Sequence, residues 1–377
     1  MIRRFYHKKL YDLITPGKVF VLYGPRQVGK TTLINHFCDE FDGTIFRSTG
    51  EDLQLQEILA NSSVQQLKLF FEDYDLIFID EAQMIPNAGQ ALKIIVDQIP
   101  DLSVVVTGSS SFKLSSAIGE PLVGRQRIKK LYPISLLELK SELGWFDVKG
   151  RLDEFMIYGM YPELFNMTSR TERIDYLHQI KDGYLFKDLL MLENLRNSNK
   201  VRDLLKLIAF QIGNEVSHQE LGKQLGMSKN TVARYLDLLE KAFVLINVRG
   251  FSRNLRKEVV KTSRYYFYDN GIRNALINNF NDLNTRNDVG QLWENFMFIE
   301  RMKMREYKQI HAETYFWRTY DQKEIDLVEQ REGNLFGYEF KHRQNKSISA
   351  PADWQKAYPD AEFKVISRDN IEEFVLN

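Results

Sequence analysis

A short apolar segment that runs into a glycine-rich loop constrains this chain more than any other feature. Val19–Tyr23 is an apolar run typical of a buried strand, and it is followed by Gly24-Pro25-Arg26-Gln27-Val28-Gly29-Lys30-Thr31-Thr32. The spacing G-x-x-x-x-G-K-T between a strand and a helix is a complete Walker A motif. Glycines let backbone N–H groups curl around phosphates, and the helix that follows points its N-terminal dipole at the same anion. We therefore expect a nucleoside triphosphate here, with Lys30 on its β- and γ-phosphates and Thr31 on Mg²⁺.

A second apolar segment ends in two acids and supplies a Walker B pattern. It runs from Asp75 to Glu81 and reads D-L-I-F-I-D-E. In such a site Asp80 would hold Mg²⁺ through water, and Glu81 would orient or polarise the attacking water.

A third apolar segment, Leu102–Thr107, is followed by Gly108 and three serines. The carboxyl ends of strands face the ligand crevice of an open α/β sheet. Thr107 or Ser109 could therefore sense the γ-phosphate or the attacking water. An ordinary turn that caps the next helix is an equally weighted alternative.

Two arginines follow at Gly124-Arg125-Gln126-Arg127. An arginine near the γ-phosphate stabilises the charge of phosphoryl transfer, and it often comes from a neighbouring subunit. Arg125 is the first choice for this role and Arg127 the second, and a solvated arginine is the alternative. A homo-oligomer is expected only if such an arginine acts across subunits.

Three segments together resemble a known family: Gly24–Thr32, Phe78–Gln83 (F-I-D-E-A-Q) and Thr107–Ser111 (T-G-S-S-S). They look like the AAA-type P-loop ATPases of bacteria and archaea that carry a C-terminal domain of unassigned function. Tyr132–Leu139 and Gly159–Glu163 extend the resemblance over nearly the whole chain. The resemblance implies an ATPase core, a winged helix-turn-helix and a PD-(D/E)xK nuclease-like C-terminus. It also implies ATP as the nucleotide, and a guanine-reading N-K-x-D motif is not seen.

The middle of the chain has a mostly helical pattern from about residue 133 to 201, which predicts a lid beside the nucleotide and a connector. Val216–Met227 then reads as a helix closed by Gly226, and Ser228 caps a second helix from Lys229 to Phe243. Two short helices joined through a glycine turn are the helix-turn-helix layout. The start of the second helix, where a DNA reader contacts bases and phosphates, displays Lys229, Asn230, Thr231 and Arg234.

A β-rich continuation follows, with apolar segments at Val244–Val248 and Tyr265–Asp269. The stretch between them is basic and would form a wing suited to phosphate contacts, with Arg253, Arg256 and Lys257 as its candidate residues. DNA is the expected partner. The alternatives are a protein–protein module and a basic loop that is merely solvated.

The last hundred residues change character. A long helix at Val289–Lys308 is followed by three strands at 313–318, 324–329 and 335–341, then by a helix near 353–358 and a strand at 363–366. The order αβββαβ matches the core of restriction-type nucleases.

Acids and a lysine fall at matching places on these strands. Asp326 lies inside the second strand, and Glu339 and Lys341 are two apart on the third, so they share a face. Two carboxylates suit Mg²⁺ that is bound by few protein ligands, and the lysine could orient a water or steady the phosphate charge. Glu294 could be a third acid. The set resembles the PD-(D/E)xK signature, and a surface salt bridge or a fold that has lost activity is the alternative.

Composition adds few constraints. Lys+Arg and Asp+Glu both number 51, so net charge indicates no partner. The single cysteine, Cys38, excludes an intrachain disulfide and a cysteine-based zinc site. No apolar run approaches the roughly 20 residues of a membrane helix, and the N-terminus lacks a signal-peptide core, which predicts a cytoplasmic protein without a membrane partner.

We expect an α/β chain of four parts: a P-loop ATPase core (1–132), a helical lid and connector (133–200), a winged helix-turn-helix (201–270) and an α+β restriction-endonuclease-like domain (271–377). Its expected cofactors are ATP and Mg²⁺. The predicted function is ATP hydrolysis coupled to DNA binding, with DNA cleavage as a separate hypothesis. The alternative is an ATP-driven signalling switch with protein partners.

Overall fold

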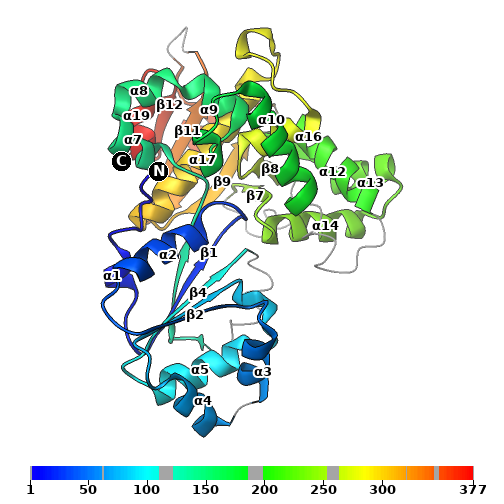
Figure 1. Ribbon diagram of the computed structural model, residues 1–377. Coiled ribbons are helices and arrows are strands. Elements are labelled where there is room, and N and C mark those ends of the chain that lie inside the picture. Colours follow the sequence, from blue (N-terminus) through cyan, green and yellow to red (C-terminus); the bar gives the residue numbers. More distant parts are fainter. Residues whose placement is uncertain are drawn as a thin grey trace. The chain divides into compact units, whose positions relative to one another are not determined.

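The computed structural model describes residues 2–61, 63–109, 122–185, 198–252, 263–319, 321–343 and 348–376. The chain divides into two compact units, Met1–Pro133 with Lys241–Phe243 and Ile134–Glu240 with Val244–Asn377. Each unit is built around a β-sheet (Figure 1).

The first unit contains a five-stranded parallel sheet in the order β2-β3-β4-β1-β5. Its strands are β1 (Val19–Tyr23), β2 (Ile45–Thr49), β3 (Leu76–Asp80), β4 (Ser103–Gly108) and β5 (Gln126–Lys130). The three apolar segments found in the sequence are the central strands β1, β3 and β4, which are buried on both faces as parallel strands usually are. The predicted α/β class and parallel sheet are therefore confirmed.

Helices cover both faces of this sheet (Figure 1). The helices of this unit are α1 (Leu10–Leu13), α2 (Lys30–Glu40), α3 (Leu53–Asn61), α4 (Val64–Phe71), the 3₁₀ turn η1 (Ala82–Met84) and α5 (Ala88–Gln98). Side chains of α3, α4 and α5, such as Leu59, Phe71 and Ile95, form one core with alternate residues of β1, β3 and β4. Figure 1 shows α2 on the other side of the sheet.

The second unit contains a mixed seven-stranded sheet in the order β12-β11-β10-β9-β7-β8-β6. Its strands are β6 (Glu215–Val216), β7 (Leu245–Gly250), β8 (Ser263–Phe267), β9 (Glu313–Arg318), β10 (Glu324–Arg331), β11 (Asn334–Phe340) and β12 (Glu362–Ile366). A short parallel pairing of β7 with β9 joins two groups of strands that the sequence assigned to separate domains. The boundary expected at residue 271 thus lies between strands of one sheet.

The helices of the second unit surround this sheet (Figure 1). They are α7 (Leu136–Leu143), α8 (Trp145–Gly150), α9 (Leu152–Tyr158), η3 (Pro162–Phe165), α10 (Arg170–Gln179), the π-turn η4 (Ile180–Leu185), α12 (Ser198–Phe210), α13 (His218–Leu225), α14 (Lys229–Lys241), α16 (Asn270–Ile277), η5 (Leu283–Thr285), α17 (Val289–Lys308), α18 (Ala352–Ala357) and α19 (Ile371–Leu376). In the part of the chain that the structure describes, no helix has the length and apolar character needed to cross a membrane.

Local capping explains where the paired helices α13 and α14 begin and end. Gly226 adopts a left-handed conformation with φ 59° directly after α13, as a helix-ending glycine does. The Ser228 hydroxyl accepts a hydrogen bond of 3.1 Å from the Thr231 N–H and so caps α14. Both signals were read correctly from the sequence.

Candidate nucleotide site and carboxylate cluster

The loop between β1 and α2 has a backbone that only glycine fits at its first position. Gly24 has φ 148°, and a Cβ there would collide with the carbonyl oxygen of Leu131. Gly29, with φ 88°, leads directly into α2, whose first residue is Lys30. The Lys30 side chain is 5% exposed and donates to the carbonyls of Gly24 (3.0 Å) and Pro25 (2.8 Å). The loop therefore surrounds the Lys30 ammonium group at the N-terminus of α2. The positive charge of Lys30 and the helix N-terminus both favour a bound anion.

The predicted Walker B acid lies beside this loop. Asp80 ends β3, and its carboxylate accepts a hydrogen bond of 2.8 Å from the Thr31 hydroxyl. Its other oxygen accepts a hydrogen bond from the hydroxyl of Thr107, on the neighbouring strand β4. Hard oxygen donors of this kind are the ligands that Mg²⁺ prefers. The residues present thus fit Mg²⁺, with Thr31 and Asp80 as the groups that would hold it.

Glu81 is held by two side chains close to Asp80. The Ser109 hydroxyl donates to the Glu81 carboxylate at 3.0 Å, and the Gln83 amide donates to the same carboxylate oxygen. The Gln83 amide also lies 3.2 Å from the Ser109 oxygen. Glu81 itself has a left-handed backbone with φ 51°, a conformation that costs about 1–3 kcal/mol for a residue with a side chain and gathers at functional sites.

Sequence reasoning missed two members of this site. Gln83 had a signal, since it lies two residues after Glu81 in the F-I-D-E-A-Q segment. Arg4 had none, because it lies 24 residues before Val28, the loop residue that it contacts. Its guanidinium is buried and donates to the carbonyls of Val28 and, at 2.6 Å, Tyr132.

Arg125 does not reach the loop within its own chain. Its guanidinium forms an ion pair of 2.5 Å with Asp97 of α5, and its carbonyl accepts from the N–H of Val19. Val19 begins β1, whereas the loop follows Tyr23 at the other end of that strand, roughly 13 Å away at 3.3 Å per residue. Arg127 donates instead to the carbonyls of Asp12 (2.8 Å) and Leu13 (3.3 Å). A catalytic role for Arg125 therefore stays a prediction only for the nucleotide site of a neighbouring subunit.

The structure brings together the residues predicted for a nuclease-like site. Strands β10 and β11 are antiparallel, and the Asp326 carboxylate accepts from the N–H of Phe340 at 2.8 Å. The Lys341 ammonium donates to Glu339 at 2.6 Å. Glu294 on α17 accepts from the hydroxyl of Tyr266 at 2.6 Å.

An arginine that the sequence did not single out lies among these acids. Arg264 on β8 is 2% exposed, and its guanidinium pairs with Glu324 at 2.6 Å. Another guanidinium nitrogen is 3.7 Å from Glu294 and 3.8 Å from Asp326. We call Arg264, Glu294, Glu324, Asp326, Glu339 and Lys341 the carboxylate cluster.

Four acids and two cations give the carboxylate cluster an excess of two negative charges when all are ionised. Burial raises the pKa of Glu294 to about 7, against the effect of Arg264. Burial, and then the charges of Glu294 and Glu339, hold the pKa of Asp326 well above its usual value. The second carboxylate oxygen of Glu339 is buried and finds no hydrogen-bond partner among the described residues. The raised pKa values reflect the cost of ionising four buried acids that only two cations balance.

The geometry nevertheless limits how a metal could be held. Among the residues that the structure describes, no group of three or more histidines, cysteines or acids is arranged to hold a metal ion. Mg²⁺ often takes only one or two protein carboxylates and fills its other positions with water and substrate phosphate. Asp326 and Glu339 fit that mode, and Glu294 accepts from Tyr266 and lies 3.7 Å from a guanidinium nitrogen of Arg264.

The residues predicted to contact DNA fall into two groups. Lys229, Asn230 and Arg234 are exposed at the start of α14, and Thr231 is half-buried there. Arg253, Arg256 and Lys257 lie outside the described residues.

Three family models match separate parts of the chain. Residues 16–140 match an AAA domain, residues 149–283 match a domain of unknown function (DUF8612), and residues 289–374 match another (DUF4143). The AAA match, together with the loop geometry, indicates nucleotide binding by the first unit.

Relatives that match most of this chain occur in bacteria and archaea. An uncharacterized protein of Mycobacterium tuberculosis is 26% identical and covers 92% of this chain and 75% of its own. An uncharacterized protein of Methanocaldococcus jannaschii is 25% identical and covers 84% of this chain and 73% of its own. Among solved structures, domain III of the Thermotoga maritima replication initiation protein DnaA shares 16% identity over 58% of this chain and 88% of its own, with a TM-score of 0.29.

Proposed function

We propose that this chain binds and hydrolyses ATP with Mg²⁺ at the loop between β1 and α2. The observation that carries the proposal is the connection of Thr31, Asp80 and Thr107, which joins the loop to the ends of β3 and β4. Lys30, the first residue of α2, donates to the carbonyls of Gly24 and Pro25 in the same loop. The AAA match over residues 16–140 supports the same reading.

Each side chain has a separate task in hydrolysis. Lys30 would exchange its carbonyl partners for oxygens of the β- and γ-phosphates. Thr31 and Asp80 would hold Mg²⁺, which neutralises phosphate charge when it is bound. Glu81, fixed by Gln83 and Ser109, would orient the water that attacks the γ-phosphorus and so releases ADP and phosphate.

Steady-state ATP hydrolysis in the presence of Mg²⁺ tests this proposal. Lys30→Ala should abolish both nucleotide binding and hydrolysis. Glu81→Gln should keep binding but slow hydrolysis about 100-fold or more, the usual contribution of a residue that activates water. The exposed Lys68 of α4 offers a control, and Lys68→Ala should behave as wild type. Equal activity of Lys30→Ala and Lys68→Ala would reject the site.

We further propose that residues 201–270 form a winged helix-turn-helix that binds DNA, with the helices of residues 133–200 as lid and connector. The support is the pair α13 and α14, joined through Gly226, with Lys229, Asn230 and Arg234 exposed at the start of α14. Lys229→Ala with Arg234→Ala should weaken DNA binding and reduce its salt dependence. Duplex and single-stranded DNA added to the ATPase assay would show whether the two activities are coupled.

A second candidate function is metal-dependent cleavage of that DNA at the carboxylate cluster, in a restriction-endonuclease-like domain (271–377). The observation that favours it is the position of Asp326 and Lys341 beside the unpartnered oxygen of Glu339, at adjacent antiparallel strands. Asp326 and Glu339 would hold Mg²⁺, and Lys341 would orient a water or the scissile phosphate.

A gel of DNA incubated with the protein and Mg²⁺ tests this candidate. Lys341→Ala should abolish any cleavage while ATP hydrolysis continues, and Lys356→Ala on α18 is the matched control. Intact DNA together with an ATPase rate that ignores DNA would favour the alternative, an ATP-driven signalling switch with protein partners.

A further inference from the structure

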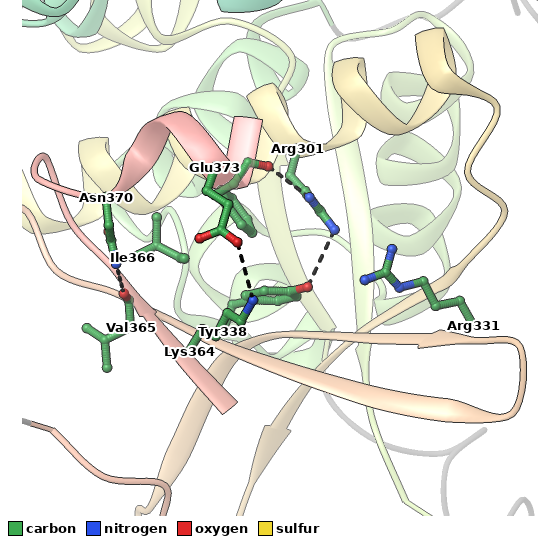
Figure 2. A pocket seen from close by; sticks show the side chains of 9 residues that line it. Arg301, Arg331, Tyr338, Lys364, Val365, Ile366, Asn370 and Glu373 are labelled. Carbon is green, nitrogen blue, oxygen red and sulfur yellow. Dashed lines mark hydrogen bonds and ion pairs between the residues drawn. The ribbon is translucent and has the colours of Figure 1, made fainter. Parts of the chain in front are cut away.

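A pocket of about 300 Å³ opens in the second unit, away from the residues assigned above. Figure 2 shows that it lies between the helices α17 and α19 and the sheet. Arg301, Arg331, Tyr338, Lys364, Glu373 and Phe374 are among the residues that line it. Tyr338 and Glu339 are neighbours on β11, so their side chains point to opposite faces of the sheet. The pocket is therefore distinct from the carboxylate cluster.

Positive charge dominates the wall of this pocket. The fully buried carboxylate of Glu329 accepts two hydrogen bonds from Arg301, at 2.9 and 3.0 Å, and one from Arg305 at 3.2 Å. The Nε atom of Arg331 is 4.0 Å from the same carboxylate. Burial opposes the charge on Glu329, but the hydrogen bonds from Arg301 keep its pKa below the usual value. One ionised acid thus faces three guanidinium groups, of which those of Arg301 and Arg331 line the pocket. Two of the three positive charges are left uncompensated by Glu329.

The guanidinium group of Arg331 can donate further hydrogen bonds. Its guanidinium lies 4.0 Å above the ring of Phe336, and within the described ranges it donates no hydrogen bond. Figure 2 shows it directed toward the pocket, with no dashed line to the other residues drawn. Lys364 stands at the rim, half-exposed and 3.9 Å from Glu373. Both cations are therefore free to turn to a ligand without breaking a short hydrogen bond.

We infer that this pocket binds a small phosphate monoester, a molecule of about the size of a mononucleotide or a sugar phosphate. A monoester carries about −1.5 to −2 charges at neutral pH, which matches the uncompensated charge of the arginines. The planar fork of Arg331 suits two phosphate oxygens at once, and Lys364 adds a point charge. The rings of Tyr338 and Phe374, 4.9 Å apart, supply an apolar wall for the rest of the ligand. The cavity volume is at the low end of ligand pockets, which favours a small molecule over a polymer.

The test needs a signal from the pocket itself, because the loop between β1 and α2 also attracts phosphates. The full chain with Lys30→Ala, labelled with ¹³C in its isoleucine methyl groups, provides one, since Ile366 lines the pocket. Ile366→Val identifies its signal. The Ile366 signal should shift saturably with adenosine 5′-monophosphate or ribose 5-phosphate, and it should not move with adenosine. This readout does not depend on ATP hydrolysis, so failure of the inference can be distinguished from failure of the proposed function.

Matched variants decide the outcome. Arg331→Gln should raise the Kd for the monoester about tenfold, as expected for one lost charge-assisted contact. Lys356→Gln, at an exposed lysine on α18, should leave the Kd unchanged. An Ile366 signal that ignores both monoesters, or that shifts equally in wild type and Arg331→Gln, would overturn the inference. Binding of inorganic phosphate with exclusion of both monoesters would overturn it as well.

Discussion

Arg4 donates a hydrogen bond to the carbonyl of Val28, in the loop that precedes Lys30. A second nitrogen of the same guanidinium donates to the carbonyl of Tyr132 at 2.6 Å. One buried cation therefore ties the start of the chain to the loop between β1 and α2 and to the segment after β5. Because a buried guanidinium is difficult to replace, we regard Arg4 as the residue that positions this loop.

Replacing Arg4 should loosen the loop without touching the nucleotide. Arg4→Ala removes two hydrogen bonds from a charged donor, each worth about 1.5–3 kcal/mol, and should lower the unfolding free energy of the first unit accordingly. We also expect weaker Mg-ATP binding, measured by calorimetry. The exposed neighbour Arg3 provides the control. If Arg4→Ala and Arg3→Ala bind ATP equally well, Arg4 does not position the loop.

Gln83 offers a test of how Glu81 is held. Gln83→Ala leaves the Glu81 carboxylate with Ser109 as its remaining described partner. Because a freer carboxylate orients water less well, kcat should fall roughly tenfold while KM for ATP stays within about twofold. Gln90→Ala, at an exposed position on α5, should change neither. A rise in KM at constant kcat would assign Gln83 to nucleotide binding instead.

The features that were predicted from sequence are those with local causes. The strands β1, β3 and β4 were visible because buried parallel strands are continuous apolar runs, and α13 and α14 because their capping residues lie next to the helix ends. Likewise, Glu339 and Lys341 could be placed on one face because strand periodicity fixes which side chains of a strand share a face.

The features that were missed depend on contacts between distant segments. No local pattern marks Arg4 as a support of the loop or Arg264 as the cation among four acids. The pairing of β7 with β9 joins residues 249–250 to 315–316, which only the folded chain brings together. Helix α16 was missed for another reason. The apolar run Tyr265–Asp269 was read as a strand to its end, whereas the Asp269 side chain caps the next helix through the N–H of Gly271 at 2.8 Å.

Glu240 on α14 should make the stability of the second unit depend on pH. Burial, with a smaller effect of Asp237, raises its pKa from 4.5 to about 7. The folded state therefore holds a proton that the unfolded state releases between these values. Its stabilising contribution is complete below pH 4.5 and is lost as pH rises through 7.

The unfolding free energy in urea at pH 5 and pH 8 measures this effect. Glu240→Gln keeps the neutral form at both values, so its stability should drop less than that of wild type, by up to about 3 kcal/mol. Glu220→Gln, at an exposed acid on α13, should follow wild type. Parallel pH profiles for wild type and Glu240→Gln would show that Glu240 ionises normally in the folded chain.

Arg264 provides the sharpest test of the carboxylate cluster. Arg264→Gln leaves four acids with Lys341 as the one cation of the cluster, and removing one partner of a buried ion pair costs about 3–5 kcal/mol. We therefore expect a lower thermal midpoint at neutral pH. If the acids can hold a divalent cation, millimolar Mg²⁺ should restore part of that loss, because it supplies the missing charge. Adding Glu339→Gln to Arg264→Gln should then remove the Mg²⁺ effect.

A comparison with Arg318 separates this behaviour from ordinary surface electrostatics. Arg318 pairs with Glu215 at 2.8 Å, and both side chains are about one quarter exposed. Since partly exposed pairs contribute about 0–1 kcal/mol, Arg318→Gln should lower the midpoint only slightly and show no response to Mg²⁺. A Mg²⁺ effect in Arg264→Gln that survives Glu339→Gln would mean that the ion binds elsewhere. An unchanged midpoint in Arg264→Gln would mean that the four acids are largely protonated and that the cluster carries no charge for a metal to balance.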